Sequence, residues 1–160
     1  MERRLDYSKA APGSVQVMYK LEKFVEDSGL ERSLLELVKI RVSQINGCAF
    51  CIDMHTKDAR ALGETEQRIY ALNAWRETPF FTDHERAGLA WAEVITLISQ
   101  THAPDEDFAA ARTEFSEEEL VKLTMAIITI NGWNRLAIAF REVPGLYQSN
   151  LQNKAVNSGS

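Results

Sequence analysis

The chain has 160 residues, of which 45% are hydrophobic and 26% charged, and its formal net charge at pH 7 is −5. This length suits one domain with its own core, and the composition is that of a globular protein rather than a disordered one. The acidic balance, without a cluster of Lys or Arg, argues against nucleic-acid binding and against anionic membrane surfaces.

The N-terminal residues Met1–Tyr7 carry charges but no apolar segment, so they do not form a secretory signal. No later apolar run approaches the roughly 18–20 residues that cross a bilayer. We therefore expect a cytoplasmic protein with no membrane partner. A structural disulfide is not expected in that reducing compartment, so the cysteines at positions 48 and 51 call for a chemical explanation.

From Ser14 onward, apolar side chains recur at helical spacing, and residues that cap or stop helices separate the segments. The expected helices open at Ser14, Ser33, Cys48, Thr65, Thr82, Pro104 and Ser116. The helix after Thr82 continues through Ile98, and the expected stops elsewhere include Gly29, Asn46-Gly47, Gly63 and Pro144-Gly145. Glu85 and Glu119 complete capping boxes with Thr82 and Ser116, respectively.

These segments predict an all-α fold, a single-domain bundle of about seven helices over residues 1–149. The small, polar residues 150–160 are expected to be a disordered tail.

The chemistry is expected at Cys48, Cys51 and His55, which lie within one short segment that opens a predicted helix. Spacings of three and four residues place all three side chains on one helix face. Cys48 stands at the helix start, where unpaired N–H groups and the helix dipole stabilise an anion. The thiolate is the nucleophilic form of cysteine, and His55 can supply a base or a stabilising charge. The pattern predicts thiol redox chemistry with Cys48 as the more ionised thiol.

Glu36 is the fourth candidate residue, on the preceding predicted helix, outside the apolar stripe formed by Leu34, Leu37 and Val38. If the two helices fold back on each other, its carboxylate can reach the thiols as a proton acceptor. A glutamate on a helix is more commonly a solvated surface residue.

A metal site is the competing interpretation of the same segment. Cys48, Cys51 and His55 could supply three zinc ligands, but a closed structural site needs four. The remaining histidines, His84 and His102, lie far along the chain. We therefore expect no bound metal or other cofactor.

The spacing of Glu36, Cys48, Cys51 and His55 resembles the alkylhydroperoxidase D-like family, within the carboxymuconolactone decarboxylase-like group. The late segment Asn131-Gly132-Trp133-Asn134-Arg135-Leu136 is similar to peroxidase-related members of this group. The resemblance covers roughly residues 30–144. It implies an all-α homo-oligomer, a trimer or hexamer, that reduces hydroperoxides through a cysteine pair.

The resemblance also implies a role for each residue. Cys51 would be oxidised to the sulfenic acid, and Cys48 would donate a proton and then form the Cys48–Cys51 disulfide. Glu36 and His55 would relay protons, and an external thiol or dithiol would restore the reduced pair. The best-studied members carry a histidine where this chain has Phe50. The alternatives are a metal-binding module using Cys48, Cys51 and His55, and a non-catalytic redox sensor or oligomeric scaffold.

Overall fold

The computed structural model describes residues 1–151, and this part of the chain is an all-α domain with no β-strand. Its helices are α1 (Tyr7–Ala10), α2 (Pro12–Glu26), α3 (Arg32–Asn46), α4 (Ala49–Ala61), α5 (Glu66–Ala71), the 3₁₀ helix η1 (Leu72–Glu77), α6 (Asp83–Thr96), α7 (Ile98–Thr101), α8 (Asp105–Arg112) and α9 (Glu117–Phe140). The predicted fold class is confirmed. The seven expected helices correspond to α2–α6, α8 and α9, while α1 and α7 are additional four-residue helices.

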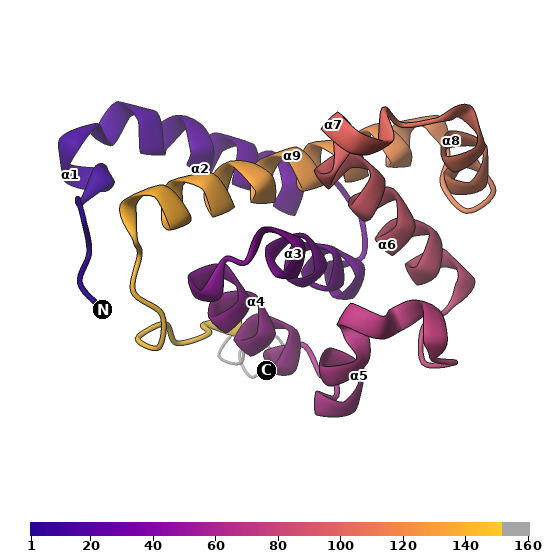
Figure 1. Ribbon diagram of the computed structural model, residues 1–160, viewed down its shortest axis with the longest axis horizontal. Coiled ribbons are helices and arrows are strands. Elements are labelled where there is room, and N and C mark those ends of the chain that lie inside the picture. The colour runs from indigo at the N-terminus through magenta and orange to yellow at the C-terminus, as the bar shows by residue number, and fades with distance from the viewer. Residues whose placement is uncertain (152–160) are drawn as a thin grey trace, which may run out of the picture.

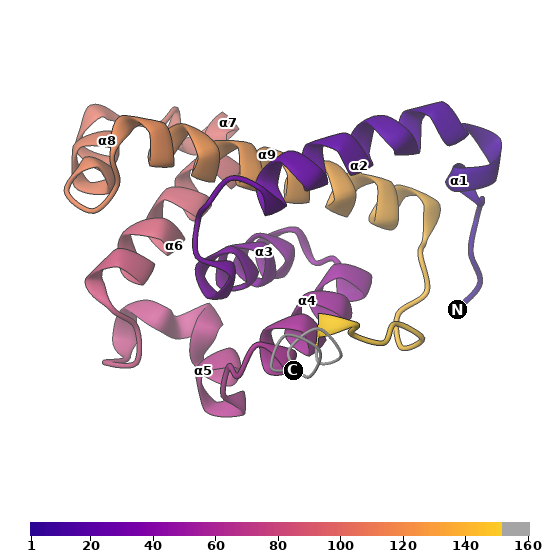
Figure 2. The same cartoon turned by 180° about the vertical axis from the view of Figure 1, so that it is seen from behind.

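The long helices form a layered bundle with α3 near its centre. Helices α2 and α9 lie side by side, and α3 and α4 pack against α9, as Figures 1 and 2 show from opposite sides. Helix α6 packs on α3 and carries α8 at the far end of the molecule (Figure 1). After α9 the chain turns back and returns to α4, so the C-terminal segment lies beside the helix that carries the cysteines.

Helix α3 is buried on almost every side, because α4, α6 and α9 all pack against it. Its apolar residues Leu34, Val38 and Val42 belong to one core cluster, and Leu37 and Ile40 belong to a second. Glu36 and Lys39 are buried on the same helix. Charges in such a position are costly unless they are paired, so their partners matter for both stability and chemistry.

Three of the predicted helix caps are present. The Thr65 side chain accepts from the Arg68 backbone, and Thr82–Glu85 and Ser116–Glu119 form complete capping boxes. These reciprocal bonds satisfy N–H groups that the first helical turn leaves without partners.

The predicted caps Ser14 and Ser33 are wrong, because both residues lie inside their helices. Helix α2 begins earlier, with Pro12 at its first position, where the fixed φ and missing N–H of proline are no disadvantage. Helix α3 begins at Arg32 after Glu31, which makes no side-chain capping bond. The short helix α1 precedes α2, and its first turn is capped by Asp6, which accepts from the Lys9 backbone N–H.

Two expected helix ends are also corrected. The helix opened by Thr82 does not continue through Ile98, because the backbone leaves helical geometry at Leu97. Helix α9 ends before Pro144-Gly145: Arg141 takes a left-handed conformation with φ 58°, and the Glu142 N–H bonds the Ala137 carbonyl. This 6→1 bond satisfies a terminal carbonyl and turns the chain toward α4.

Among the described residues, no helix is both long and apolar enough to span a membrane. The predicted tail, residues 150–160, lies outside the described residues apart from Asn150 and Leu151, which line the cavity described below. Its disorder stays a prediction.

Candidate active site

The turn between α3 and α4 fixes the position of the first cysteine. Gly47 ends α3 in a left-handed conformation with φ 71°, a geometry that costs glycine little and other residues more. The Cys48 N–H then bonds the Ser43 carbonyl, and Cys48 itself becomes the N-cap of α4. Cys51 follows in the first turn of the same helix. The predicted placement of the pair at a helix start therefore agrees with the structure.

The two cysteine sulfurs lie 2.6 Å apart, in hydrogen-bond contact. Both cysteines are free and only 1% exposed. The thiol of Cys51 lowers the pKa of Cys48, assisted against burial by the backbone N–H groups of Cys51 and Phe50. The hydrogen bond with Cys48, together with burial, raises the pKa of Cys51 far above its usual range. Of the two thiols, Cys48 is therefore the one that ionises more readily.

Asn134 on α9 holds the turn and the sulfurs together. Its amide donates to Ser43 Oγ at 3.0 Å and its carbonyl oxygen accepts from Asn46 Nδ2 at 2.9 Å. Hydrogen bonding from Asn134 also lowers the pKa of both Cys48 and Cys51. The late segment that resembles peroxidase-related proteins thus contributes directly to the cysteine environment.

Glu36 on α3 reaches the cysteine helix at His55, whereas the sequence-based expectation is a contact with the thiols. Its Oε2 lies 2.8 Å from Nδ1 of His55, and both residues are buried. Burial raises the pKa of Glu36, but the charges and hydrogen bonds of His55 and Lys39 outweigh it and hold that pKa below its ordinary value. A carboxylate bound to one ring nitrogen fixes the orientation and tautomer of an imidazole.

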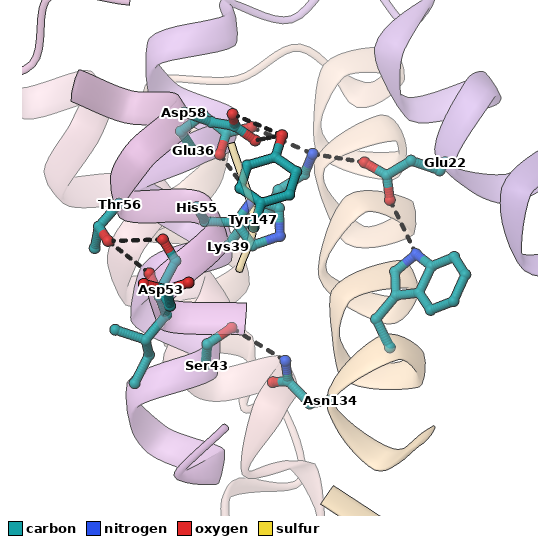
Figure 3. A network of polar contacts seen from close by, with 12 residues as sticks. Glu22, Glu36, Lys39, Ser43, Asp53, His55, Thr56, Asp58, Asn134 and Tyr147 are labelled. Atoms are coloured by element: carbon teal, nitrogen blue, oxygen red, sulfur yellow. Dashed lines mark hydrogen bonds and ion pairs between the residues drawn. The ribbon is translucent and has the colours of Figure 1, made fainter. Parts of the chain in front are cut away.

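A chain of charges continues from Glu36 to helix α2. Lys39 Nζ lies 3.4 Å from Glu36 Oε1 and 2.6 Å from Glu22 Oε1. The second oxygen of Glu22 accepts from the Trp133 indole on α9 at 3.2 Å. Figure 3 shows the chain passing from α3 toward Glu22. Each buried charge in it has a partner of opposite charge or a polar donor.

The C-terminal segment adds a second set of polar contacts to the site, through Tyr147. The Tyr147 hydroxyl donates to both carboxylate oxygens of Asp58, at 2.9 and 3.0 Å (Figure 3). Burial and this bond to Asp58 raise the pKa of Tyr147, so the phenol stays protonated. The segment is attached to α4 by the Gly145 N–H on Asp53 and by Lys57 Nζ on the Tyr147 carbonyl.

A cavity of about 610 Å³ opens in front of these groups. Glu36, Cys51 and His55 line it together with aromatic and apolar side chains, including Tyr19 and Trp133. Cys48 is not among the lining residues, so Cys51 is the sulfur that faces the space. The volume is in the range of small-molecule binding sites.

The metal-binding alternative finds no support in the cysteines. Within residues 1–151, the group of side chains with ligand atoms close enough to hold one ion is Glu36, His55 and Asp58, within 4.8 Å of one another. Glu36 and His55 pair with each other, and Asp58 accepts from Tyr147. Lys39 adds a positive charge at the Glu36 carboxylate. These contacts engage both carboxylates and Nδ1 of His55, and none of them involves a cysteine.

The structure brings together all four residues that the sequence singled out: Glu36, Cys48, Cys51 and His55. Sequence reasoning missed the polar residues around them, namely Glu22, Lys39, Asp58, Tyr147 and the hydrogen-bonding role of Asn134. For two of them a signal was available, because Lys39 lies three residues after Glu36 and Asp58 three after His55, each on the same helix face as its partner.

The chain is similar in sequence to a known protein family and to several known proteins. Residues 15–94 match the model of the carboxymuconolactone decarboxylase family. The uncharacterised protein YdfG of Bacillus subtilis is 50% identical over 139 residues, which cover 87% of this chain and 95% of YdfG. A 45-residue stretch, 28% of this chain and 25% of the relative, is 40% identical to alkyl hydroperoxide reductase AhpD of Bradyrhizobium diazoefficiens.

A solved structure with the same fold is ATU0492 of Agrobacterium tumefaciens, a protein of unknown function described as a candidate antioxidant defence protein AhpD. It matches with a TM-score of 0.88 and 46% identity, over 91% of this chain and 100% of that one. The agreement extends over nearly the whole of both chains.

Proposed function

Because the chain belongs to the carboxymuconolactone decarboxylase family, in its AhpD-like group, we propose that it is a thiol-dependent peroxidase that reduces hydroperoxides through Cys51 and Cys48. The observation that carries the proposal is a reduced cysteine pair in hydrogen-bond contact, of which Cys51 faces a cavity of about 610 Å³ beside His55 and Glu36. A small molecule can enter such a cavity, whereas a macromolecule cannot.

In the first step, Cys51 attacks the hydroperoxide. The Cys48 thiolate takes the proton of Cys51 across the sulfur–sulfur hydrogen bond, and the new Cys51 thiolate attacks the terminal oxygen of ROOH. The O–O bond breaks, Cys51 becomes the sulfenic acid, and the alkoxide leaves. Cys48 then donates its proton to the alkoxide, which leaves as the alcohol ROH.

This order of proton transfer and attack accounts for two properties of the cysteine pair that otherwise point in opposite directions. Cys48 is the more ionised thiol in the resting site, yet Cys51 is the sulfur that meets the substrate. A nucleophile whose proton is removed only as it reacts needs an adjacent base, and Cys48 is that base.

In the second step, the pair forms its disulfide. The Cys48 thiolate attacks the sulfur of the Cys51 sulfenic acid, the S–S bond forms, and hydroxide leaves. His55, held by Glu36, supplies the proton that turns the hydroxide into water. The two electrons that reduced the peroxide have come from the two thiols.

The cycle closes when an external thiol or dithiol reduces the Cys48–Cys51 disulfide by exchange and becomes oxidised itself. The proposal places the protein in the cytoplasm, where such reductants are maintained. It also retains a homo-oligomer, a trimer or hexamer, as its assembly. Exposed apolar side chains on α2 and α9, among them Val17, Phe24, Val121 and Ile128, support self-association, which light scattering would measure.

The test is turnover of an organic hydroperoxide with dithiothreitol as reductant. The wild-type protein should consume the hydroperoxide catalytically, and Cys51→Ser should abolish turnover. Equal rates for the two proteins would remove Cys51 from the mechanism. A Cys48–Cys51 disulfide that forms without turnover would instead favour the redox-sensor alternative.

A further inference from the structure

The peroxidase mechanism uses Glu36 and His55 but leaves the buried Lys39 without a role. Lys39 is only 5% exposed and lies on α3 three residues after Glu36. Its ammonium contacts Glu22 Oε1 at 2.6 Å and Glu36 Oε1 at 3.4 Å, so it lies between two carboxylates from different helices. The position is unusual, because a buried lysine is costly and is retained only where its charge is compensated.

We propose that Lys39 is a positioning residue that keeps the Glu36 carboxylate charged and directed at His55. The inference rests on the proposed peroxidase function for its catalytic meaning, but its physical content, the state of Glu36, does not depend on turnover.

The two carboxylate oxygens of Glu36 make different contacts, as the proposal requires. One oxygen, Oε1, faces Lys39, and the other, Oε2, lies 2.8 Å from His55 Nδ1. The two contacts therefore fix the plane of the carboxylate, because rotating the carboxylate to break one contact would also disturb the other. Glu22 is itself held by the Trp133 indole at 3.2 Å, which keeps the far end of the chain from moving.

Lys39 matters because burial and two nearby carboxylates disfavour the charge on Glu36, so that charge depends on His55 and Lys39. Asp58 on α4 is a second buried carboxylate whose oxygen lies within 4.8 Å of the Glu36 and His55 ligand atoms. Tyr147, from the C-terminal segment, directs its hydroxyl at Asp58 rather than at Glu36. Glu22 from α2 adds negative charge on the far side of Lys39. His55 stabilises the Glu36 carboxylate fully only when the ring is protonated, so Lys39 is the permanent positive charge at this carboxylate.

The test is a carbon-13 chemical-shift titration of the Glu36 carboxyl in the reduced protein, with the resonance assigned from its loss in Glu36→Gln. In wild type the midpoint should lie below the ordinary value of about 4.3 for glutamate. In Lys39→Met it should rise by about 1–3 pH units, the usual effect of losing a neighbouring opposite charge. Lys39→Arg should restore a low midpoint. Lys23→Met, which removes an exposed lysine from the surface pair with Asp27, should leave the midpoint unchanged.

Glu22→Gln should not raise the titration midpoint of Glu36, in contrast to Lys39→Met. General structural damage would not produce this difference between the two variants. Without the competing charge on Glu22, Lys39 interacts with Glu36 alone, so the Glu36 midpoint should fall or stay low. This variant also serves if Lys39→Met does not fold. A rise in Glu22→Gln, or an unchanged midpoint in folded Lys39→Met, would overturn the inference.

The link to catalysis is read separately, from the pH dependence of Cys48–Cys51 disulfide formation with an organic hydroperoxide. In Lys39→Met the acid limb of this profile should move to higher pH with the Glu36 midpoint, and Lys39→Arg should return it. If the protein does not react with hydroperoxides at all, the peroxidase proposal fails, while the titration still decides the role of Lys39. An acid limb that stays in place while the midpoint moves would overturn the catalytic part of the inference.

Discussion

His55 Nδ1 on α4 lies 2.8 Å from Glu36 Oε2 on α3, a contact between buried residues 19 positions apart in the chain. The contact exists because Gly47 reverses the chain and α4 packs back along α3. It leaves the second ring nitrogen of His55 available to the cavity chemistry, since a bond at Nδ1 fixes the tautomer.

Replacing either member of this pair should slow disulfide formation strongly. General acid–base groups contribute about 10²–10⁴-fold, so His55→Gln and Glu36→Gln should each reduce the rate by about 10²-fold or more. Stopped-flow measurement of the single turnover with an organic hydroperoxide checks this. His84→Gln is the matched control, because His84 lies on α6 against the Glu114 carbonyl, and its rate should equal that of wild type. Rates within twofold of wild type for both site variants would remove the pair from the mechanism.

Cys48→Ser should stop the cycle after its first step. The sulfenic acid on Cys51 then has no resolving thiol, although its formation is slower without the Cys48 base. Treatment with one equivalent of hydroperoxide followed by a dimedone probe should label Cys51, detected by mass spectrometry. The same treatment should leave Cys51→Ser unlabelled. Label on Cys48 in that second variant would reverse the assigned roles of the two sulfurs.

Asn134→Ala should weaken both the fold and the ionisation of the cysteine pair. Loss of the amide leaves the buried Ser43 hydroxyl without its donor, at a cost of about 1–3 kcal/mol in the free energy of unfolding. The pKa of Cys48 should rise, because Asn134 is among the groups that lower it. Urea unfolding measures the first effect, and the pH dependence of iodoacetamide alkylation measures the second. An unchanged alkylation profile in the folded variant would contradict the role of Asn134 at the sulfurs.

Glu93 offers a test of stability away from the cavity. Its carboxylate accepts from Arg41, Trp75 and Arg76, each at 2.8 Å. Burial raises the pKa of Glu93, but these three donors outweigh it and hold the pKa below its ordinary value. A group with a lowered pKa in the folded state contributes stability above its unfolded pKa and loses it as the pH falls.

Glu93→Gln should therefore cost about 1.5–3 kcal/mol at pH 7, the range for hydrogen bonds to charged groups. The difference from wild type should shrink as the pH falls below about 4.3, the ordinary pKa of glutamate. Urea unfolding at pH 7 and at pH 3 measures both values. A difference that stays the same at the two pH values would contradict this account of Glu93.

The sequence was informative where local patterns govern structure. Capping boxes at Thr82 and Ser116 depend on residues three positions apart, so the beginnings of α6 and α9 could be predicted. The side chain of Ser33 is able to cap a helix, but α3 begins one residue earlier, at Arg32. Local propensity is a weak guide where a helix is buried on nearly all sides.

The same distinction holds for the candidate site: contacts within one segment could be predicted from the sequence, and contacts between helices could not. Cys48, Cys51 and His55 share one helix, and their spacing alone indicates that they meet. Glu36 contacts Lys39 on α3 and His55 on α4. Lys39 in turn contacts Glu22 on α2, and Tyr147 comes from the segment after α9. Such contacts depend on how helices pack, which helical spacing within one segment does not encode. The roles of the four predicted residues in catalysis remain predictions.

The most direct measurement of the central claim is a thiol count before and after one equivalent of an organic hydroperoxide, with the product identified by intact and peptide mass spectrometry. Both thiols should be lost, with a mass decrease of two hydrogens and one intramolecular peptide link between Cys48 and Cys51. Two thiols still titratable after the hydroperoxide is added would contradict the claim.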